Sequence, residues 1–281
     1  MKKINKTIIL TGSSGVIGKS LKNFLKKKSL NLILLNGSKK KKNTKNLKEI
    51  LDLDFADCII HLAGKDDYNS SSGGEIKKIN NILDKKVILI VKKLKIPFII
   101  FSSTNRVYEG SIKSFISENT KVIPTSIYSQ SKLNTEKKLS KLNSKLAILR
   151  LPSVLSKFSK KGLIYFLQKK MIKNKGIEIF NSQSLFNNVI LQEDLNKMIH
   201  FMIMKEKKLK QKEIFNLNSE NPIKFNEIIK YMLKKVNSNS RIIKKNVNFI
   251  SKTYSNKYQK KIFHFRAKSV KSSINSYLND F

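Results

Sequence analysis

Short apolar runs without polar alternation recur through the first half of the chain, separated by stretches in which apolar residues return every three or four positions. A run that is apolar on both sides fits a buried strand, and the longer spacing fits a helix packed on one side. Strands and helices that alternate in this way are typical of a parallel sheet covered on both faces. The pattern therefore predicts an α/β fold with a doubly wound parallel sheet, whose strands we expect at Thr7–Leu10, Leu30–Leu35, Cys58–Ala63, Phe98–Phe101 and Leu146–Leu151.

The pattern changes after Pro152. A basic helical pattern covers residues 158–174, and short strands with a further amphipathic helix follow it. This mixture predicts a smaller α+β substrate lobe in the C-terminal part of the chain. We expect two domains, 1–155 and 156–281, with segments near 187–204 returning to the core of the first.

The composition is strongly basic: 58 Lys and Arg stand against 19 Asp and Glu, for a formal net charge of +39. Such a balance usually suggests a nucleic acid or an anionic membrane as partner. However, only four of the basic residues are arginine, and the lysines are spread along the chain among abundant Asn and Ile. Nucleic-acid readers favour Arg, because it makes bidentate and stacking contacts. We therefore attribute the charge to an A/T-biased coding sequence and expect no specific nucleic-acid partner.

Cysteine usage and the first residues bear on the cellular setting. The single cysteine, Cys58, allows no internal disulfide, and no Cys/His cluster resembles a zinc site, so we expect no metal. Met1–Lys3 followed by Ile8–Leu10 is similar to the start of a signal peptide, but glycines and serines break the apolar run. We interpret this run as the first buried strand and expect a cytoplasmic protein without a membrane span.

Three glycines, Gly12, Gly15 and Gly18, lie between the first predicted strand and its helix. Glycines let the backbone turn tightly, allow a pyrophosphate to approach the main chain and let the helix pack closely on the strand. A turn with a purely structural role is the alternative. The placement of this turn between two well-formed elements near the N-terminus favours a dinucleotide site.

This turn resembles the G-x-x-G-x-x-G segment of the extended short-chain dehydrogenase/reductases, a family of nucleotide-sugar epimerases, dehydratases and reductases. His61-Leu62-Ala63-Gly64 is similar to the H-L-A-A segment of that family. Asn81, or Asn80 beside it, resembles the asparagine behind the family's active site. The resemblance implies a Rossmann-type fold and NAD(P) bound by Gly12, Ser14, Gly15, Val16, Ile17, Gly18, Leu62, Ala63, Gly64, Asn81, Ser102, Tyr128, Lys132 and Leu151.

The end of the second predicted strand bears on the choice between NADP and NAD. An NAD site usually has an acidic residue there that binds the ribose hydroxyls, whereas this chain has Asn36, followed by Ser38 and Lys39. A carboxylate would repel the 2′-phosphate of NADP, while a hydroxyl and an ammonium can bond it. We therefore expect these three residues to contact the cofactor and favour NADP, with NAD as the alternative.

Tyr128 and Lys132 form a Y-x-x-x-K pair, which a helix places on one side. A phenol has a reference pKa of about 10, and an adjacent ammonium favours its phenolate. Tyr128 could then exchange a proton with a substrate oxygen while a hydride moves to or from nicotinamide. The segment from Ser102 to Tyr108 resembles the family's S-S-[ST]-x-x-V-Y segment. This resemblance implies that Thr104 hydrogen-bonds the reacting oxygen and that Lys132 also holds the nicotinamide ribose.

Two positions depart from the patterns of the family. Its 4,6-dehydratases carry Asp-Glu directly after the catalytic Thr, where this chain has Asn105-Arg106, which argues against dehydratase chemistry. Just before Val189, where many epimerases of the family have an arginine for the sugar diphosphate, the chain has Asn187. Arg106, Arg150 or nearby lysines stay open as phosphate-binding alternatives.

The resemblance covers residues 7–235 and implies an NAD(P)-dependent enzyme that performs 4-keto reduction or 4-epimerisation on a nucleotide-linked or other phosphorylated sugar. It also implies a homodimer, formed through the helices that contain Asn81 and Tyr128. A second hypothesis is a regulatory or interaction protein that binds the cofactor without turnover, because a fold alone does not fix a function. A third, motivated by charge alone, is a nucleic-acid binder.

Overall fold

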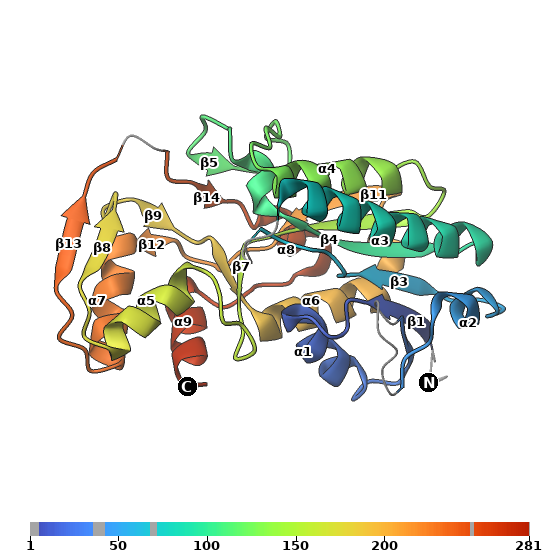
Figure 1. Ribbon diagram of the computed structural model, residues 1–281, viewed down its shortest axis with the longest axis horizontal. Helices are drawn as coiled ribbons and strands as arrows, with labels where there is room; N and C mark the ends of the chain where they lie inside the picture. The colour runs from blue at the N-terminus through green and yellow to red at the C-terminus, as the bar shows by residue number, and fades with distance from the viewer. Residues whose placement is uncertain (1–5, 36–42, 68–71, 248–249, 281) are drawn as a thin grey trace. The chain divides into compact units, whose positions relative to one another are not determined.

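The computed structural model describes residues 6–35, 43–67, 72–247 and 250–280 (Figure 1). The chain forms two compact units and passes between them several times, so that each unit is assembled from separate stretches. The first unit comprises Met1–Gly110, Val122–Arg150 and Asn196–Phe215, and the second comprises Ser111–Lys121, Leu151–Leu195 and Asn216–Phe281.

The first unit is built on a parallel sheet, as the apolar runs predicted. Within the described residues this sheet has six strands in the order β11-β6-β4-β3-β1-β2. β1 lies between β2 and β3, and Ile9 stands opposite Ile33 on one side and Ile59 on the other. Central strands are buried on both faces, and all seven residues of β4 are buried. The strands are β1 Lys6–Thr11, β2 Leu30–Leu34, β3 Cys58–His61, β4 Phe98–Thr104, β6 Lys145–Leu151 and β11 Lys212–Asn216.

Helices cover both faces of this sheet. Figure 1 shows α3 and α4 on one side and α1 and α6 on the other. The side chain of Asn196 in α6 donates a hydrogen bond to the hydroxyl of Ser20 in α1 at 3.0 Å. No helix in the described part of the chain is long and apolar enough to cross a membrane. The helices are α1 Val16–Leu25, α2 Leu47–Leu51, α3 Gly73–Lys93, the 3-10 turn η1 Asn105–Tyr108, α4 Ile127–Leu139, α6 Gln192–Met204 and the 3-10 turn η2 Glu206–Lys208.

α3 starts at a capped N-terminus. It begins at Gly73, because Ser72 caps it by accepting a hydrogen bond from the Glu75 N–H at 3.2 Å. Two polar residues are among its buried positions, and both belong to the site described below. The buried positions recur at helical spacing and are Ile76, Asn80, Asp84, Val87, Ile90 and Val91.

One apolar cluster of the first unit lies between α3 and the sheet. Ile59, Ile99 and Phe101 of the strands pack with Val87 and Ile90 of α3 in one apolar cluster. Full burial of such a side chain stabilises the fold by roughly 1.5–3 kcal/mol. The cluster therefore fixes α3 against the sheet and holds its polar side chains in place.

The second unit mixes helices with short strands, as predicted for a smaller α+β lobe. In the part of the chain that is described, β7 pairs with β10, β8 with β13 and β5 with β14 in parallel, while β9 and β12 pair antiparallel. Met171, Ile228 and Ile274 belong to its own apolar cluster. Its elements are β5 Phe115–Ile116, β7 Ser153–Leu155, α5 Leu163–Ile172, β8 Ile177–Phe180, β9 Leu185–Phe186, β10 Val189–Leu191, β12 Ile223–Lys224, α7 Phe225–Lys235, β13 Ile242–Lys245, β14 Thr253–Tyr254, α8 Lys257–Phe263 and α9 Val270–Leu278.

Candidate active site

The glycine turn between β1 and α1 packs directly against the end of β3. Gly12 has a φ of +72°, and a Cβ added there would lie 2.6 Å from the backbone nitrogen of Ala63. A Cβ on Gly18 would overlap the carbonyl oxygen of Gly12. The Gly15 N–H closes the turn by donating to the same carbonyl oxygen at 3.0 Å. Glycine is therefore required at Gly12 and Gly18 by backbone contacts within the first unit.

This turn lies where the strand order of the sheet reverses. β2 lies on one side of β1 and β3 on the other, and in open α/β sheets ligands bind beyond the carboxyl ends of the strands at such a point. α1 starts after Gly15, which has no side chain that could cap the first N–H groups of the helix. The helix dipole adds positive potential there. The turn thus suits an anionic group such as a pyrophosphate.

A buried polar chain links β1, β3, α3 and α4 behind the turn. The Thr11 hydroxyl and His61 Nδ1 are 2.8 Å apart, and Thr11 Oγ1 also accepts a hydrogen bond from the Ala63 N–H at 3.2 Å. His61 Nε2 lies 3.5 Å from one oxygen of Asp84, whose other oxygen accepts from the Thr135 hydroxyl at 2.7 Å. Burial lowers the pKa of His61 despite its bond to Asp84. The ring is therefore neutral near pH 7, and its contacts connect Thr11 of β1 to Asp84 of α3.

Asp84 keeps its charge in this buried chain. Burial by itself would raise the pKa of Asp84, but hydrogen bonds from His61 and Thr135 hold that pKa below its usual value. The Lys138 ammonium, 3.6 Å from Asp84 Oδ2, acts in the same direction. α3 and α4 are consequently joined by a charged contact as well as by apolar packing.

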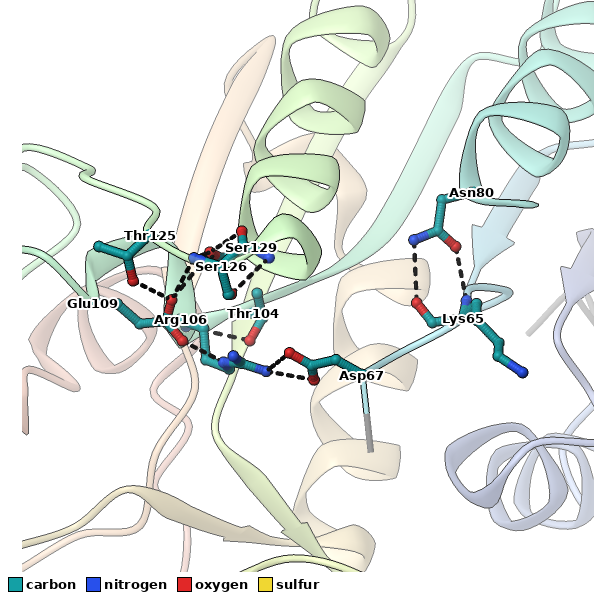
Figure 2. A network of polar contacts seen from close by, with 9 residues as sticks. All are labelled: Lys65, Asp67, Asn80, Thr104, Arg106, Glu109, Thr125, Ser126 and Ser129. Carbon is teal, nitrogen blue, oxygen red and sulfur yellow. Dashed lines mark hydrogen bonds and ion pairs between the residues drawn. The ribbon is translucent and has the colours of Figure 1, made fainter. Parts of the chain in front are cut away.

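Of the two neighbouring asparagines, Asn80 is the one that the structure brings to the site. Its Oδ1 accepts a hydrogen bond from the Lys65 N–H at 2.7 Å, and its Nδ2 donates to the Lys65 carbonyl at 3.1 Å (Figure 2). Nδ2 also lies 3.1 Å from the Ser131 hydroxyl. Asn81 instead accepts a hydrogen bond from Lys138 at 2.7 Å. Asn80 thus holds the segment that follows β3, residues 62–67, and Asn81 does not.

Lys132 places a buried ammonium beside that segment. The residue is 5% exposed, and its Nζ lies 4.4 Å from the centre of the Phe101 ring. A Cβ added at Gly64 would lie 3.6 Å from this Nζ, so the Gly64 backbone approaches the ammonium closely. Burial lowers the pKa of Lys132 to about 8, although Asp84 and Glu136 favour its charged form. The ammonium is therefore mostly charged at pH 7 yet close to losing its proton.

Thr104 and Tyr128 are connected through Arg106. Thr104 is buried at the end of β4, and its Oγ1 accepts a hydrogen bond from the Arg106 N–H at 3.2 Å. Tyr128 is half-buried in the first turn of α4, and the guanidinium carbon of Arg106 lies 5.5 Å from the centre of its ring. Lys132 follows one helical turn later. The structure thus joins Thr104 and Tyr128 through one arginine, which sequence reasoning had left as a possible phosphate ligand.

Two further residues have partners within the fold: Arg150, considered for phosphate binding, and Asn187, which stands where many members of the family have an arginine. Arg150 is buried and donates to Glu136 at 2.7 Å and to the Tyr108 hydroxyl at 2.6 Å. In the second unit, the Asn187 side chain donates to the Tyr254 carbonyl at 2.8 Å and accepts from the Tyr254 N–H at 2.9 Å. This pairing attaches β14 as a strand neighbour would. Both side chains therefore form hydrogen bonds within the fold. The bonds of Arg150 to Glu136 and Tyr108 argue against Arg150 as a phosphate ligand.

The remaining predicted cofactor residues fall into three groups. Ser102 donates from its hydroxyl to the His61 carbonyl at 3.3 Å, at the end of β3, and Leu151 is buried at the end of β6. Asn36, Ser38 and Lys39 lie outside the described residues, so their predicted contacts stay a prediction. Ser14 lies in the glycine turn, Val16 and Ile17 lie in the first turn of α1, and Leu62 directly follows β3.

Sequence reasoning missed three acidic residues of this region, Asp67, Asp84 and Glu109. Asp67 and Glu109 form ion pairs with Arg106, and Asp84 lies in the buried chain behind the glycine turn. A signal was available, because in a chain with only 19 acidic residues against 58 basic ones each carboxylate is the more informative charge.

Comparisons with known proteins agree with the fold and the motifs. A family model described as RmlD substrate binding domain matches residues 6–270, whereas no curated protein matches the sequence. UDP-glucose 4-epimerase of Thermotoga maritima, solved with UDP-glucose, is 18% identical with a TM-score of 0.80, and 98% of each chain is covered. RMD of Pseudomonas aeruginosa, complexed with NADPH, is 16% identical with a TM-score of 0.78, covering 98% of this chain and 99% of its own. The enzyme WbmG of Bordetella bronchiseptica, in complex with NAD and UDP, is 15% identical with a TM-score of 0.82, covering 98% and 94%.

Proposed function

Because the chain belongs to the RmlD substrate binding domain family, within the extended short-chain dehydrogenase/reductases, we propose that it is a nicotinamide-dependent reductase of a 4-keto sugar carried on a nucleotide or another phosphate. One observation carries the proposal. Lys132 is buried beside Gly64, one helical turn after Tyr128. Burying an ammonium costs free energy unless the charge is paired, and this position suits contacts of the ammonium with a ribose and a phenolate.

The described residues fit a nicotinamide dinucleotide. Gly12 and Gly18 remove side chains where a Cβ would collide with backbone, and the start of α1 would hold the pyrophosphate. Lys132 would hold the ribose next to the nicotinamide, and Asn80 orders the neighbouring segment through Lys65. When bound, the nicotinamide supplies the hydride.

The proposed proton chemistry belongs to Tyr128 and Thr104. Thr104 Oγ1 accepts from the Arg106 N–H, so its own hydroxyl proton can be donated to the substrate oxygen. Tyr128 gives its proton to that oxygen as the keto group becomes an alcohol, acting as a general acid. The Lys132 ammonium stabilises the phenolate that is left. Asn105 and Arg106 replace the carboxylates that a 4,6-dehydratase would use, which argues against dehydration.

Reduction and 4-epimerisation use the same side chains and differ in the fate of the cofactor. A reductase consumes NADPH, whereas an epimerase regenerates its NAD in each cycle. Asn36, Ser38 and Lys39 supply no carboxylate and suit a 2′-phosphate, which favours NADPH and therefore reduction. Epimerisation of a UDP-sugar is the second candidate, because the Thermotoga protein is an epimerase and WbmG was solved with NAD and UDP.

We also propose a homodimer formed through α3 and α4. Ile82 and Leu89 on α3 are 44% and 47% exposed, and exposed apolar positions on one helix favour an interface. Light scattering on the purified protein tests this assembly.

Cys58 is buried and carries no disulfide, which supports the proposed reducing, cytoplasmic setting.

Cofactor binding and turnover test the function together. The purified protein is titrated with NADPH and NADH at physiological salt, with binding followed by nicotinamide fluorescence, and is then assayed with 4-keto sugar nucleotides. We expect NADPH to bind at least about tenfold more tightly, a difference of ~1.4 kcal/mol, and to be consumed. Tighter NADH binding with interconversion of UDP-sugars would favour the epimerase. Cofactor binding without turnover of any sugar would favour the regulatory hypothesis and contradict the proposal.

A further inference from the structure

Glu109 directly follows η1 and gathers the residues at the start of α4. Its Oε2 accepts hydrogen bonds from the Thr125 hydroxyl at 2.9 Å, the Ser126 N–H at 3.2 Å and the Ser129 hydroxyl at 3.1 Å (Figure 2). A negative charge near the first turn of a helix is also favoured by the helix dipole. These contacts fix the turn of α4 that contains Tyr128.

Arg106 connects this cluster to the segment after β3. Its Nε donates to the other oxygen of Glu109, and its Nη1 donates to both oxygens of Asp67 at 2.6 and 2.8 Å (Figure 2). Burial opposes the charged guanidinium, but hydrogen bonds with Asp67 and Glu109 raise the pKa of Arg106 above its ordinary value. Burial would also raise the pKa of Glu109, yet Arg106 and Thr125 hold it below its usual value. Charge-assisted hydrogen bonds of this kind are stronger than neutral ones.

The segment that contains Gly64 is thereby held at two places. Asn80 of α3 bonds the backbone of Lys65 on both its N–H and its carbonyl, and Arg106 of η1 bonds the side chain of Asp67. Figure 2 shows these two attachments, at Lys65 and at Asp67. Arg106 therefore bonds the segment beside the proposed cofactor to the start of the helix that carries the proposed catalytic pair.

We propose that Arg106 is a positioning residue, which fixes the Tyr128 ring relative to this segment; the inference rests on the proposed function. The guanidinium carbon lies 5.5 Å from the centre of that ring, and the Arg106 N–H bonds the hydroxyl oxygen of Thr104. Asp67 and Glu109 more than balance the charge of Arg106. This excess of negative charge argues against Arg106 as a ligand for the substrate phosphate.

The charges near Tyr128 give opposite expectations for two neutral substitutions. The groups concerned are Lys132 on α4, Arg106 on η1, Glu109 after η1 and Asp67 after β3. Removing the guanidinium leaves the carboxylates less compensated and disfavours the phenolate, whereas removing Asp67 leaves the guanidinium less compensated and favours it. A role limited to packing predicts no such opposition.

The first test compares Arg106→Gln and Asp67→Asn with a control, Lys137→Gln. The control removes an exposed charge from α4, the helix that contains Tyr128. Tyrosine labelled with 13C at Cζ gives an NMR titration for Tyr128, whose signal is identified by its loss in Tyr128→Phe. We expect the titration midpoint to rise in Arg106→Gln, to fall in Asp67→Asn and to stay in place in Lys137→Gln. This readout needs no turnover, so an inactive wild-type protein would contradict the proposed function while the position of Arg106 is still tested.

The second test is kinetic. We expect Arg106→Gln to lower kcat roughly 10- to 100-fold, the effect of a slightly misplaced catalytic group, with KM and NADPH affinity unchanged. Arg106→Lys should restore little, because an ammonium cannot bridge two carboxylates with a planar fork. Asp67→Asn combined with Arg106→Gln should be no worse than Arg106→Gln alone, since both act in one network.

Two results would overturn the inference: an unchanged Tyr128 midpoint with wild-type kcat in Arg106→Gln, or an equal loss of kcat and cofactor affinity in that variant. If Arg106→Gln does not fold, Asp67→Asn decides alone, and an unchanged or raised midpoint there overturns it.

Discussion

The two halves of the proposed site are built by different means. In the half formed by the glycine turn and β3, backbone packs on backbone, and a single added methyl group at Gly12 would collide with Ala63. In the half formed by η1 and α4, ionised side chains around Arg106 set the positions. The first half therefore limits the volume of the side chains that can be placed there, and the second half limits their charge. The same kind of substitution should consequently have different effects in the two halves.

The largest effect is expected where the second half meets the substrate. Tyr128→Phe removes the proton donor and should lower kcat roughly 100- to 10,000-fold. NADPH affinity should not change, because the glycine turn and Lys132 are untouched. Steady-state kinetics with a fluorescence titration of NADPH measures both, and wild-type turnover in this variant would exclude Tyr128 as the acid.

The next largest effect is expected from a substitution in the half formed by the glycine turn and β3. Gly12→Ala forces a side chain into a φ of +72° and to 2.6 Å from Ala63, which should lower the free energy of unfolding by roughly 1–3 kcal/mol and weaken NADPH binding. Gly74→Ala on α3 is the matched control, because its Cβ would meet nothing within 4 Å and should stabilise the helix by about 0.5–1 kcal/mol. Urea unfolding compares the two, and equal stability of both variants would contradict the volume restriction.

Lys132 belongs to both halves of the proposed site, because it lies beside Gly64 after β3 and is part of α4. Burial lowers its pKa to about 8 in the folded protein, whereas an unfolded chain keeps this proton up to about pH 10.4. Between these values the unfolded state binds more protons, so folding becomes more favourable as pH rises. Relative to Lys132→Met, the wild-type free energy of unfolding should increase by about 1 kcal/mol per pH unit in this window. Parallel pH dependences of the two proteins, measured by urea unfolding, would refute it.

The parts of this molecule that could be predicted are those in which a residue's neighbours in sequence determine its surroundings. The strands were recognisable because β4 and its neighbours are buried on both faces. The glycine turn and the Tyr128–Lys132 pair were recognisable because strand-turn-helix order and helical spacing place them. The expected parallel sheet and the family were confirmed for these reasons.

The parts that could not be predicted depend on helix rotation or on distant pairs. Asn80 and Asn81 differ by about 100° around α3, and that rotation alone decides which of them bonds Lys65. Arg106 and Asp67 meet although 39 residues separate them. No local pattern shows such a contact, and the many lysines of this chain concealed Arg106, a cation with specific acidic partners.

The position of Asn80 on α3 has a thermodynamic consequence for the proposed homodimer. Ile82 and Leu89 follow Asn80 by about 200° and about 180° around the helix, so α3 grips Lys65 on one side and presents exposed apolar groups on the other. A partner that docks on those groups and displaces the helix would alter cofactor affinity, and by reciprocity the cofactor would alter the affinity for the partner by the same factor. Protein concentration would then act as an effector of the site.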